Sequence, residues 1–410
     1  MLIIDAHEDI AWNMASFGRD FTRSAAETRR LEAGGSTPAR NDDALLGYPE
    51  YLAGRVAVVV GSLFAAPLRH AEGEWEKLTY ADDHQAHRLY MAQIDLYHRL
   101  ADEHPDHFRL LRTRPELDAL IAAWQQLPAP VLPADEEPGA PPDRETLERR
   151  AVRRAEAAAL RRDGAAHPEA QAEPAGPGGP PVGLVIGMEG ADAVRRPEEL
   201  ELWYERGLRS VGPAWVGTRY SGGSREPGPL TAAGFELLER MAGLNLALDV
   251  THMDEQAVLQ ALDVYPGTIL ASHSNALALL RGATGNRHLP DRVLHGLIER
   301  DALVCSVPFN AFLKAGWRKG DRKDAVSLER LVDQIDYVCQ AAGDARHAGI
   351  GTDFDGGFGW QSTPVEIDSI ADLQKLVPAL AKRGYTEADI AAILSGNLLD
   401  RLRRVFPERL

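Results

Sequence analysis

Short runs of apolar residues alternate along the chain with longer stretches in which apolar residues recur every three or four positions. The short runs predict strands and the longer stretches predict amphipathic helices. The predicted strands are Leu2–Ile4, Val56–Ser62, Val182–Met188, Ser210–Val216, Leu244–Val250, Thr268–Ala271, Ala302–Val307 and Ala348–Gly351. The clearest predicted helices are Ala81–Leu100, Pro197–Glu205, Ala232–Ala242, Glu255–Ala261, Pro290–Arg300 and Ser327–Ala341.

This repeated strand–helix alternation predicts a parallel sheet in an α/β protein. Eight such units predict a single (β/α)8 TIM-type barrel domain over residues 1–410, with its active site at the carboxyl ends of the strands. A doubly wound open sheet is the competing architecture. We favour the barrel because candidate ligands follow so many of the predicted strands.

Two stretches depart from the alternation. Residues 127–181 are rich in Pro, Ala, Glu and Arg and carry no strand signal, which predicts a partly disordered insertion that covers one face or contacts another subunit. Residues 19–48 follow the first strand without clear periodicity, and we expect them to form a loop over the mouth of the barrel.

Composition narrows the class of protein. An apolar content of 44% and a charged content of 26% are those of an ordinary globular chain. The net charge of -16 argues against nucleic acid or an anionic membrane as a partner. Cys305 and Cys339 lie in apolar surroundings and are expected to be buried free thiols. Neither a membrane span nor a signal peptide is recognisable, so a cytoplasmic location is expected.

The first predicted strand leads directly into a histidine and a carboxylate. His7 and Asp9 are two positions apart, so in an extended segment both side chains point to the same side and can reach one metal ion. Alone, each such residue is explained by an ordinary structural role. Four further strand-like runs, however, lead into Glu189, His252, His273 and Asp353. Together, at one end of a barrel, these residues predict a metal site.

The predicted ligands suit zinc, which binds imidazole nitrogens and carboxylate oxygens. Two such ions lie roughly 3.5–4 Å apart when a carboxylate bridges them, and a water between them becomes a nucleophile at neutral pH. Glu189 suits the bridge because one carboxylate has two oxygens. Asp353 would then act as a base or an acid beside the water.

Several motifs strengthen this interpretation. They are Ile4-Asp5-Ala6-His7-Glu8-Asp9, Met188-Glu189-Gly190, Asp249-Val250-Thr251-His252, Ser272-His273-Ser274, Asn286-Arg287-His288-Leu289-Pro290-Asp291 and Gly351-Thr352-Asp353-Phe354-Asp355-Gly356. In order and spacing they resemble the membrane (renal) dipeptidase family, which consists of zinc metallopeptidases on an amidohydrolase-type barrel. The resemblance runs from residue 2 to about residue 406, interrupted by the insertion.

The resemblance implies a role for each residue. His7 and Asp9 would bind one zinc ion, His252 and His273 would bind the other, and Glu189 would bridge them. Asp353 would activate the bridging water and pass its proton to the leaving amine. Arg287 would hold the terminal carboxylate of the substrate. The implied cofactors are two Zn²⁺ ions per chain, with other divalent metals able to replace them, and the implied assembly is a homodimer.

The chain departs from the family around the substrate. Trp215 stands where members typically carry a histidine that steadies the oxyanion, and an indole N–H donates one hydrogen bond but carries no charge. Asp192 replaces another histidine, and Asn310 stands where a tyrosine is often found. Trp215 and Asn310 are therefore expected to contact a substrate whose binding differs from that in the family.

Three functions follow from these observations. The first is a dinuclear zinc dipeptidase that accepts small dipeptides, including those with a D-residue at the C-terminal side. The second is an amidohydrolase-like enzyme acting on another small amide, a lactone or an ester, with Trp215 as an apolar wall. The third is a non-catalytic metal-binding scaffold that acts through its insertion. Asp353 argues against the third, because a structural metal site does not need it.

Overall fold

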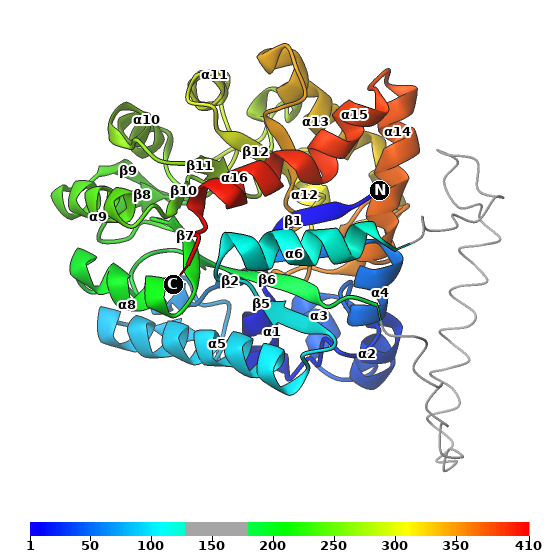
Figure 1. Cartoon of the computed structure of the whole chain (residues 1–410), viewed down its shortest axis with the longest axis horizontal. Coiled ribbons are helices and arrows are strands. Elements are labelled where there is room, and N and C mark those ends of the chain that lie inside the picture. The colour runs from blue at the N-terminus through cyan, green and yellow to red at the C-terminus, as the bar shows by residue number, and fades with distance from the viewer. Residues whose placement is uncertain (128–178, 410) are drawn as a thin grey trace.

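A computed structural model describes residues 1–127 and 179–409 of the chain. The insertion predicted at residues 127–181 therefore lies, apart from its two ends, outside the described residues. Within the described ranges the chain forms one barrel of strands surrounded by helices (Figure 1).

The barrel consists of parallel strands that follow one another around the sheet nearly in chain order. They are β1 (Ile3–Glu8), β2 (Val56–Leu63), β6 (Val182–Glu189), β7 (Leu208–Gly212), β10 (Ala247–Asp249), β11 (Ile269–Ala271), β12 (Leu303–Ser306) and β13 (Ala348–Ile350). A parallel bridge between Glu8 and Phe354 joins the last strand region to the first. The nearly closed sheet confirms the predicted (β/α)8 TIM-type fold and excludes the open sheet.

The long strands are buried along their whole length. Every residue of β1, β2 and β6 is buried, as expected for parallel strands whose two faces are covered by helices and by the barrel interior. Cys305 on β12 and Cys339 are buried free thiols, as predicted. Among the described residues, no helix has both the length and the apolar character needed to cross a membrane.

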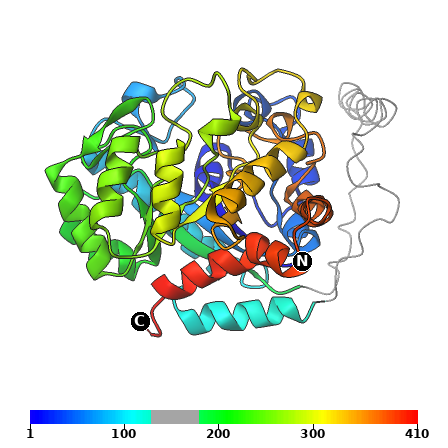
Figure 2. The ribbon, with the colours of Figure 1, turned by 90° about the horizontal axis from the view of Figure 1, so that it is seen from above.

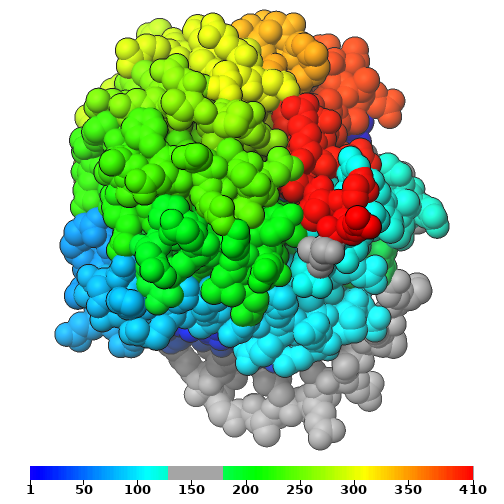
Figure 3. Space-filling model, turned by 60° about the vertical axis from the view of Figure 1, so that its left-hand side comes forward, coloured from blue at the N-terminus to red at the C-terminus, as the bar shows by residue number. Residues whose placement is uncertain are grey.

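Amphipathic helices form the outer layer. The predicted ones are present as α5 (Asp83–Glu103), α8 (Leu200–Glu205), α9 (Ala232–Gly243), α10 (Glu255–Val264), α11 (Asp291–Glu299) and α13 (Glu329–Ala342). Two others, α6 (Arg114–Gln125) and α16 (Asn397–Val405), lie side by side near the start of β1 (Figures 1 and 2). An ion pair between Arg403 and Asp118 links them, and the space-filling view shows their contact (Figure 3). They cover the end of the barrel opposite to the carboxyl ends of the strands.

Several elements were not predicted. Residues 19–48 contain α2 (Ala25–Glu32) and α3 (Thr37–Asn41), so the prediction of a wholly irregular loop is wrong. Other unpredicted elements are α1 (Ile10–Phe17), α4 (Tyr48–Ala53), α14 (Leu376–Lys382), α15 (Glu387–Ala391) and β5 (Phe108–Leu110). Most of them are too short to show a period clearly. For α6, however, the capping box of Thr113 and Glu116 is a readable start signal.

Two predicted strands extend furthest beyond the observed ones. The run Ser210–Val216 contains β7 only as far as Gly212, because Pro213 has no N–H for the ladder. The run Leu244–Val250 begins before β10, since Asn245 has a left-handed backbone with a φ of 53°. In both cases a single residue with special backbone chemistry sets the end of the strand.

Candidate metal centre

Side chains from the carboxyl ends of five strands meet at one end of the barrel. They are His7 and Asp9 from β1, Glu189 from β6, His252 after β10, His273 after β11 and Asp353 after β13. His7 and Glu189 belong to the strands themselves, whereas the other four lie in the turns that follow. The structure thus brings together all six residues that the sequence singled out for the metal and its water.

The first half of the cluster surrounds the His7 imidazole. Its Nε2 atom lies 3.9 Å from Asp9 Oδ1, 3.7 Å from Glu189 Oε2 and 4.0 Å from Asp353 Oδ1. This Nε2 is buried and has no hydrogen-bond partner among the described residues. Such separations are too long for hydrogen bonds. They suit atoms around a shared ion, to which each ligand is bound at about 2.0–2.2 Å.

The second half surrounds the other oxygen of Glu189. Glu189 Oε1 lies 2.9 Å from His252 Nε2 and 3.4 Å from His273 Nε2, and the two imidazole Nε2 atoms are 3.1 Å apart. Glu189 therefore presents one carboxylate oxygen to each half of the cluster. That is the geometry a bridging ligand requires.

Burial sets the protonation of the cluster. Burial, with Arg287 adding to it, lowers the pKa of His7 to about 3, and it lowers the pKa of His252 and His273 well below the ordinary value. These imidazoles are neutral, as metal ligands must be. Burial raises the pKa of Asp9 to about 6.

The remaining carboxyl groups behave in the same way. Burial and then the neighbouring Asp9 raise the pKa of Glu189 and of Asp353 well above the ordinary values. Packed carboxylates of this kind attract cations. The donor types and the unpartnered His7 Nε2 therefore fit one or two divalent metal ions.

The backbone at the centre adopts rare conformations. His252, Asp353 and Asp355 have φ angles of 68°, 54° and 64°, in the left-handed region that side chains other than glycine seldom occupy. At Gly356, a Cβ atom would lie 2.1 Å from Asp353 Oδ1 and 2.7 Å from Asp9 Oδ2. Strain and a close approach are thus concentrated where the candidate ligands meet.

Further buried groups, which the sequence did not single out, hold the ligands in place. Asp5 Oδ1 accepts hydrogen bonds from the backbone N–H groups of His7 (3.2 Å) and Thr352 (2.8 Å), which ties β1 to the turn after β13. Ser62 donates to Asp9 Oδ1, and the Tyr90 hydroxyl donates to the Glu189 carbonyl oxygen at 2.7 Å. Of these groups, only Asp5 could have been found from the sequence, because it stands in the same motif as His7, two residues before it.

Arg287 lies beside the cluster with part of its charge unpaired. Its Nη2 donates to the carbonyl oxygen of His273 at 2.8 Å. Its Nε and Nη1 are buried and have no partner among the described residues. The guanidinium carbon lies 4.8 Å from the centre of the Phe312 ring, and Arg287 lines a cavity together with His252 and Asn286. The side chain can therefore bind an anionic group of a ligand.

The other two predicted substrate contacts differ in position. Trp215 is half-buried, with its ring 6.3 Å from that of His252 and 4.9 Å from that of Phe64, so it stands at the edge of the cluster. Asn310 is fully buried. Its Nδ2 donates to the Thr363 carbonyl oxygen at 2.9 Å, and its described hydrogen bonds do not reach the cluster.

Comparison with known sequences identifies relatives. The model of the membrane dipeptidase family (peptidase family M19) matches residues 146–408, a range that includes Glu189, His252, His273, Arg287 and Asp353. An uncharacterized protein in the pqqA 5' region of Klebsiella pneumoniae is 32% identical over 236 residues, covering 55% of this chain and 82% of that protein. Dipeptidase tcpJ of Claviceps purpurea is 27% identical over 179 residues, covering 43% of this chain and 38% of that protein. The chain spans about half the length of three further curated relatives.

Comparison with solved structures shows the same fold. A metallopeptidase of Rhodobacter sphaeroides, solved with a phosphinate mimic of the dipeptide L-Ala-D-Ala, superposes with a TM-score of 0.67. The two sequences are 21% identical, and the match covers 99% of each chain. At this identity the likeness concerns the barrel, which includes the β1 region that the family model does not match.

Proposed function

The chain belongs to the membrane dipeptidase family, whose relatives indicate a metallo-dipeptidase, and on this premise we propose that it hydrolyses small dipeptides with two zinc ions. His7 and Asp9 would hold one ion, His252 and His273 would hold the other, and Glu189 would be their shared ligand. One observation carries the proposal. The two oxygens of Glu189 face different sets of ligands, at 3.7 Å from His7 Nε2 and 2.9 Å from His252 Nε2.

When bound, two such ions lower the pKa of a water so that it becomes a nucleophile at neutral pH. Asp353 Oδ1, 4.0 Å from His7 Nε2, is placed to take a proton there. The carboxylate of Asp353 can accept that proton and then pass it to the departing amine. Asp353 follows β13 with a left-handed φ of 54°, and its carboxyl group lies beside His7.

Arg287 supplies the contact for the substrate's free carboxylate. Its Nε and Nη1 have no partner among the described residues, so either can donate a charge-assisted hydrogen bond to a carboxylate. The Rhodobacter relative was solved with a mimic of L-Ala-D-Ala. We therefore include dipeptides with a D-residue at the C-terminal side among the substrates.

Trp215 supports a second candidate, an amidohydrolase-like enzyme for another small amide, a lactone or an ester. Its ring approaches that of His252 to 6.3 Å. It offers an apolar surface and one N–H where the family has a histidine, so an oxyanion there receives no full positive charge. An apolar surface of this kind suits substrates that carry no second charged group. The proposed cytoplasmic location and homodimeric assembly remain predictions.

The test is reconstitution of the metal-free protein with zinc, followed by assays on L,L and L,D dipeptides and on lactones. We expect zinc-dependent dipeptide hydrolysis, with two ions bound per chain. Trp215→His should raise kcat/KM for dipeptides if the histidine is what the site lacks. Two bound ions with turnover of lactones alone would establish the second candidate, and a protein that binds no zinc would refute both.

A further inference from the structure

The imidazole of His273 is held through its second nitrogen by a buried serine, which is bonded in turn to Asp249, the half-buried last residue of β10. Ser272 Oγ lies 2.9 Å from His273 Nδ1 and 2.5 Å from Asp249 Oδ2. Asp249 Oδ1 accepts two backbone N–H groups, those of Thr251 and Ser272, each at 3.0 Å. Ser272 and His273 are 3% and 1% exposed, so the contact between the hydroxyl and the imidazole is shielded from water.

The proton positions in this chain follow from the groups involved. The Asp249 carboxylate only accepts hydrogen bonds, so the single hydroxyl proton of Ser272 is donated to it. Ser272 Oγ is then left as an acceptor towards His273 Nδ1. The imidazole must therefore carry its proton on Nδ1, and its Nε2 lone pair points at the Glu189 oxygen 3.4 Å away.

We propose that Asp249 and Ser272 are positioning residues that fix His273 in the tautomer able to bind a metal through Nε2. This inference rests on the proposed metal centre. In other metal sites a carboxylate or carbonyl usually accepts the outer N–H of a ligating histidine directly. Here a serine hydroxyl transmits the effect of the carboxylate.

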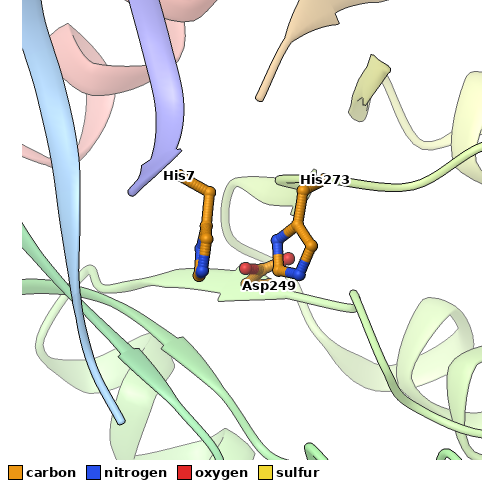
Figure 4. A group of neighbouring side chains, drawn as sticks. All are labelled: His7, Asp249 and His273. Carbon is orange, nitrogen blue, oxygen red and sulfur yellow. The ribbon is translucent and has the colours of Figure 1, made fainter. Parts of the chain in front are cut away.

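The position of Asp249 admits another role. His7, Asp249 and His273 have ligand atoms within 4.8 Å of one another, and Figure 4 shows the Asp249 carboxylate beside the two rings. Both Asp249 oxygens accept hydrogen bonds, one from two backbone groups and one from Ser272. Oδ2, which accepts only the Ser272 hydroxyl, still has a second lone pair. Direct ligation by Asp249 is therefore the alternative that the variants below must distinguish from its action through Ser272.

His252 provides a comparison within the same centre. Its Nδ1 lies 3.1 Å from Ser224 Oγ. Ser224 follows β8 (Ser221–Gly223), and among the described residues its hydroxyl has no carboxylate behind it. That hydroxyl can donate to the His252 carbonyl oxygen only at 3.5 Å, a long and weak hydrogen bond, so it fixes the tautomer of His252 less firmly than Ser272 fixes that of His273.

The test combines zinc titration against a competing chelator with ¹⁵N NMR of the imidazoles, which reports the tautomer without reference to activity. The variants are Ser272→Ala, Ser272→Thr, Asp249→Asn and Ser224→Ala. Ser274→Ala is the matched control, since it removes a buried hydroxyl from the other side of His273 that bonds Thr251.

We expect Ser272→Ala to weaken the binding of one zinc ion about 10–100-fold, the usual effect of losing such a partner, while Ser274→Ala binds as wild type. Ser224→Ala should lose less, and Ser272→Thr should restore binding. Asp249→Asn keeps the backbone bonds through Oδ1 but donates through Nδ2. The serine proton then turns to His273 Nδ1, and the NMR signal should shift to the Nε2–H form.

Two results would overturn the proposal that Asp249 acts on His273 through Ser272. One is a Ser272→Ala protein whose zinc affinity and His273 tautomer match those of wild type. The other is complete loss of one ion in Asp249→Asn with none of the effect in Ser272→Ala, which would make Asp249 a ligand. A wild-type protein that binds no zinc would instead refute the metal centre. The His273 tautomer in Ser272→Ala and Asp249→Asn, measured by NMR, would then still test whether Asp249 acts through Ser272.

Discussion

The two halves of the metal centre are held by different means. His7 lies on β1, which pairs with β2 but shifts register between Asp5 and Glu8, and its neighbour Asp9 is packed against Ser62 and Gly356. His252 and His273 lie in turns, the first with a left-handed φ of 68°, and their outer nitrogens are hydrogen-bonded to serines. In the first half β1 and its side-chain partners Asp5 and Ser62 hold the ligands. In the second half serine side chains bond the outer nitrogens of both imidazoles.

The two halves also differ in how the sequence reveals them. The second half and Glu189 fall within the part of the chain that the family model matches, whereas His7 and Asp9 precede it. The fold joins them, because closing the barrel brings the carboxyl end of β1 next to that of β13. Glu189, with one carboxylate oxygen towards each half, would then join the two halves into one centre.

Removing the shared carboxylate should have the largest effect. Glu189→Gln keeps the shape of the side chain but loses the charge that faces both halves. We expect the loss of both ions and at least a 10³-fold fall in kcat/KM, since each ion contributes several kcal/mol to catalysis. Metal analysis and dipeptide kinetics measure this, with Glu198→Gln, an exposed carboxylate nearby, as the control. Retention of both ions would show that Glu189 does not bridge.

Replacing one histidine of either half should show whether the two halves bind their ions independently. His7→Ala and His252→Ala should each bind one zinc ion per chain instead of two and lose about 10²–10³-fold in kcat, because the remaining ligands still form a partial site. Zinc titration with a chelator measures the stoichiometry, and His84→Ala, an exposed histidine, is the control. Loss of both ions in either variant would mean that the halves fold or bind only together.

Replacing Asp353 should reduce catalysis without releasing either metal ion. Asp353→Asn removes the proton acceptor while keeping its volume, so kcat should fall about 10²–10⁴-fold, the usual contribution of general acid–base catalysis. Both zinc ions should remain, which metal analysis checks on the same sample. A loss of one ion together with activity would make Asp353 a ligand of the His7 half.

Gly356 should show the smallest effect and should act on the His7 half alone. In Gly356→Ala the new methyl group would collide with Asp353 Oδ1 and Asp9 Oδ2. Relief of such a contact typically costs about 1–3 kcal/mol, so we expect roughly 5–100-fold weaker binding of one ion. The control is Gly357→Asn, because that position has a φ of 81°, which Asn tolerates, and no atom within 4 Å of the added Cβ. Equal affinities in the two variants would exclude a tight fit at Gly356.

Much of the fold was readable from the sequence. Eight apolar runs alternating with helical periods predict the barrel, because burial on both faces makes parallel strands continuously apolar. The strand ends were harder to predict. Pro213 and Asn245 stop or delay a ladder that the apolar pattern alone would continue. Short helices such as α2 and α3 escaped prediction, because one or two turns show too few repeats of the helical period.

The candidate site was readable to a similar degree. The residue types and their positions after strands predicted the six-residue cluster, and Arg287 lies beside it with unpaired donors. Asn310 was also predicted to contact the substrate, and this stays a prediction. Its Nδ2 donates to the Thr363 carbonyl oxygen, while its buried Oδ1 has no hydrogen-bond partner among the described residues. A position in the sequence just after a strand does not say which way a side chain turns.

The sequence by itself determined the fold class and the chemical types of the groups at the strand ends, because strand periodicity and residue type are local properties. Only the tertiary structure decided that Glu189 divides its two oxygens between His7 and His252, and that Ser272 connects Asp249 to His273. These contacts depend on barrel closure, strand register and left-handed turns. Such features arise from packing between residues far apart in the chain, and no local pattern records them.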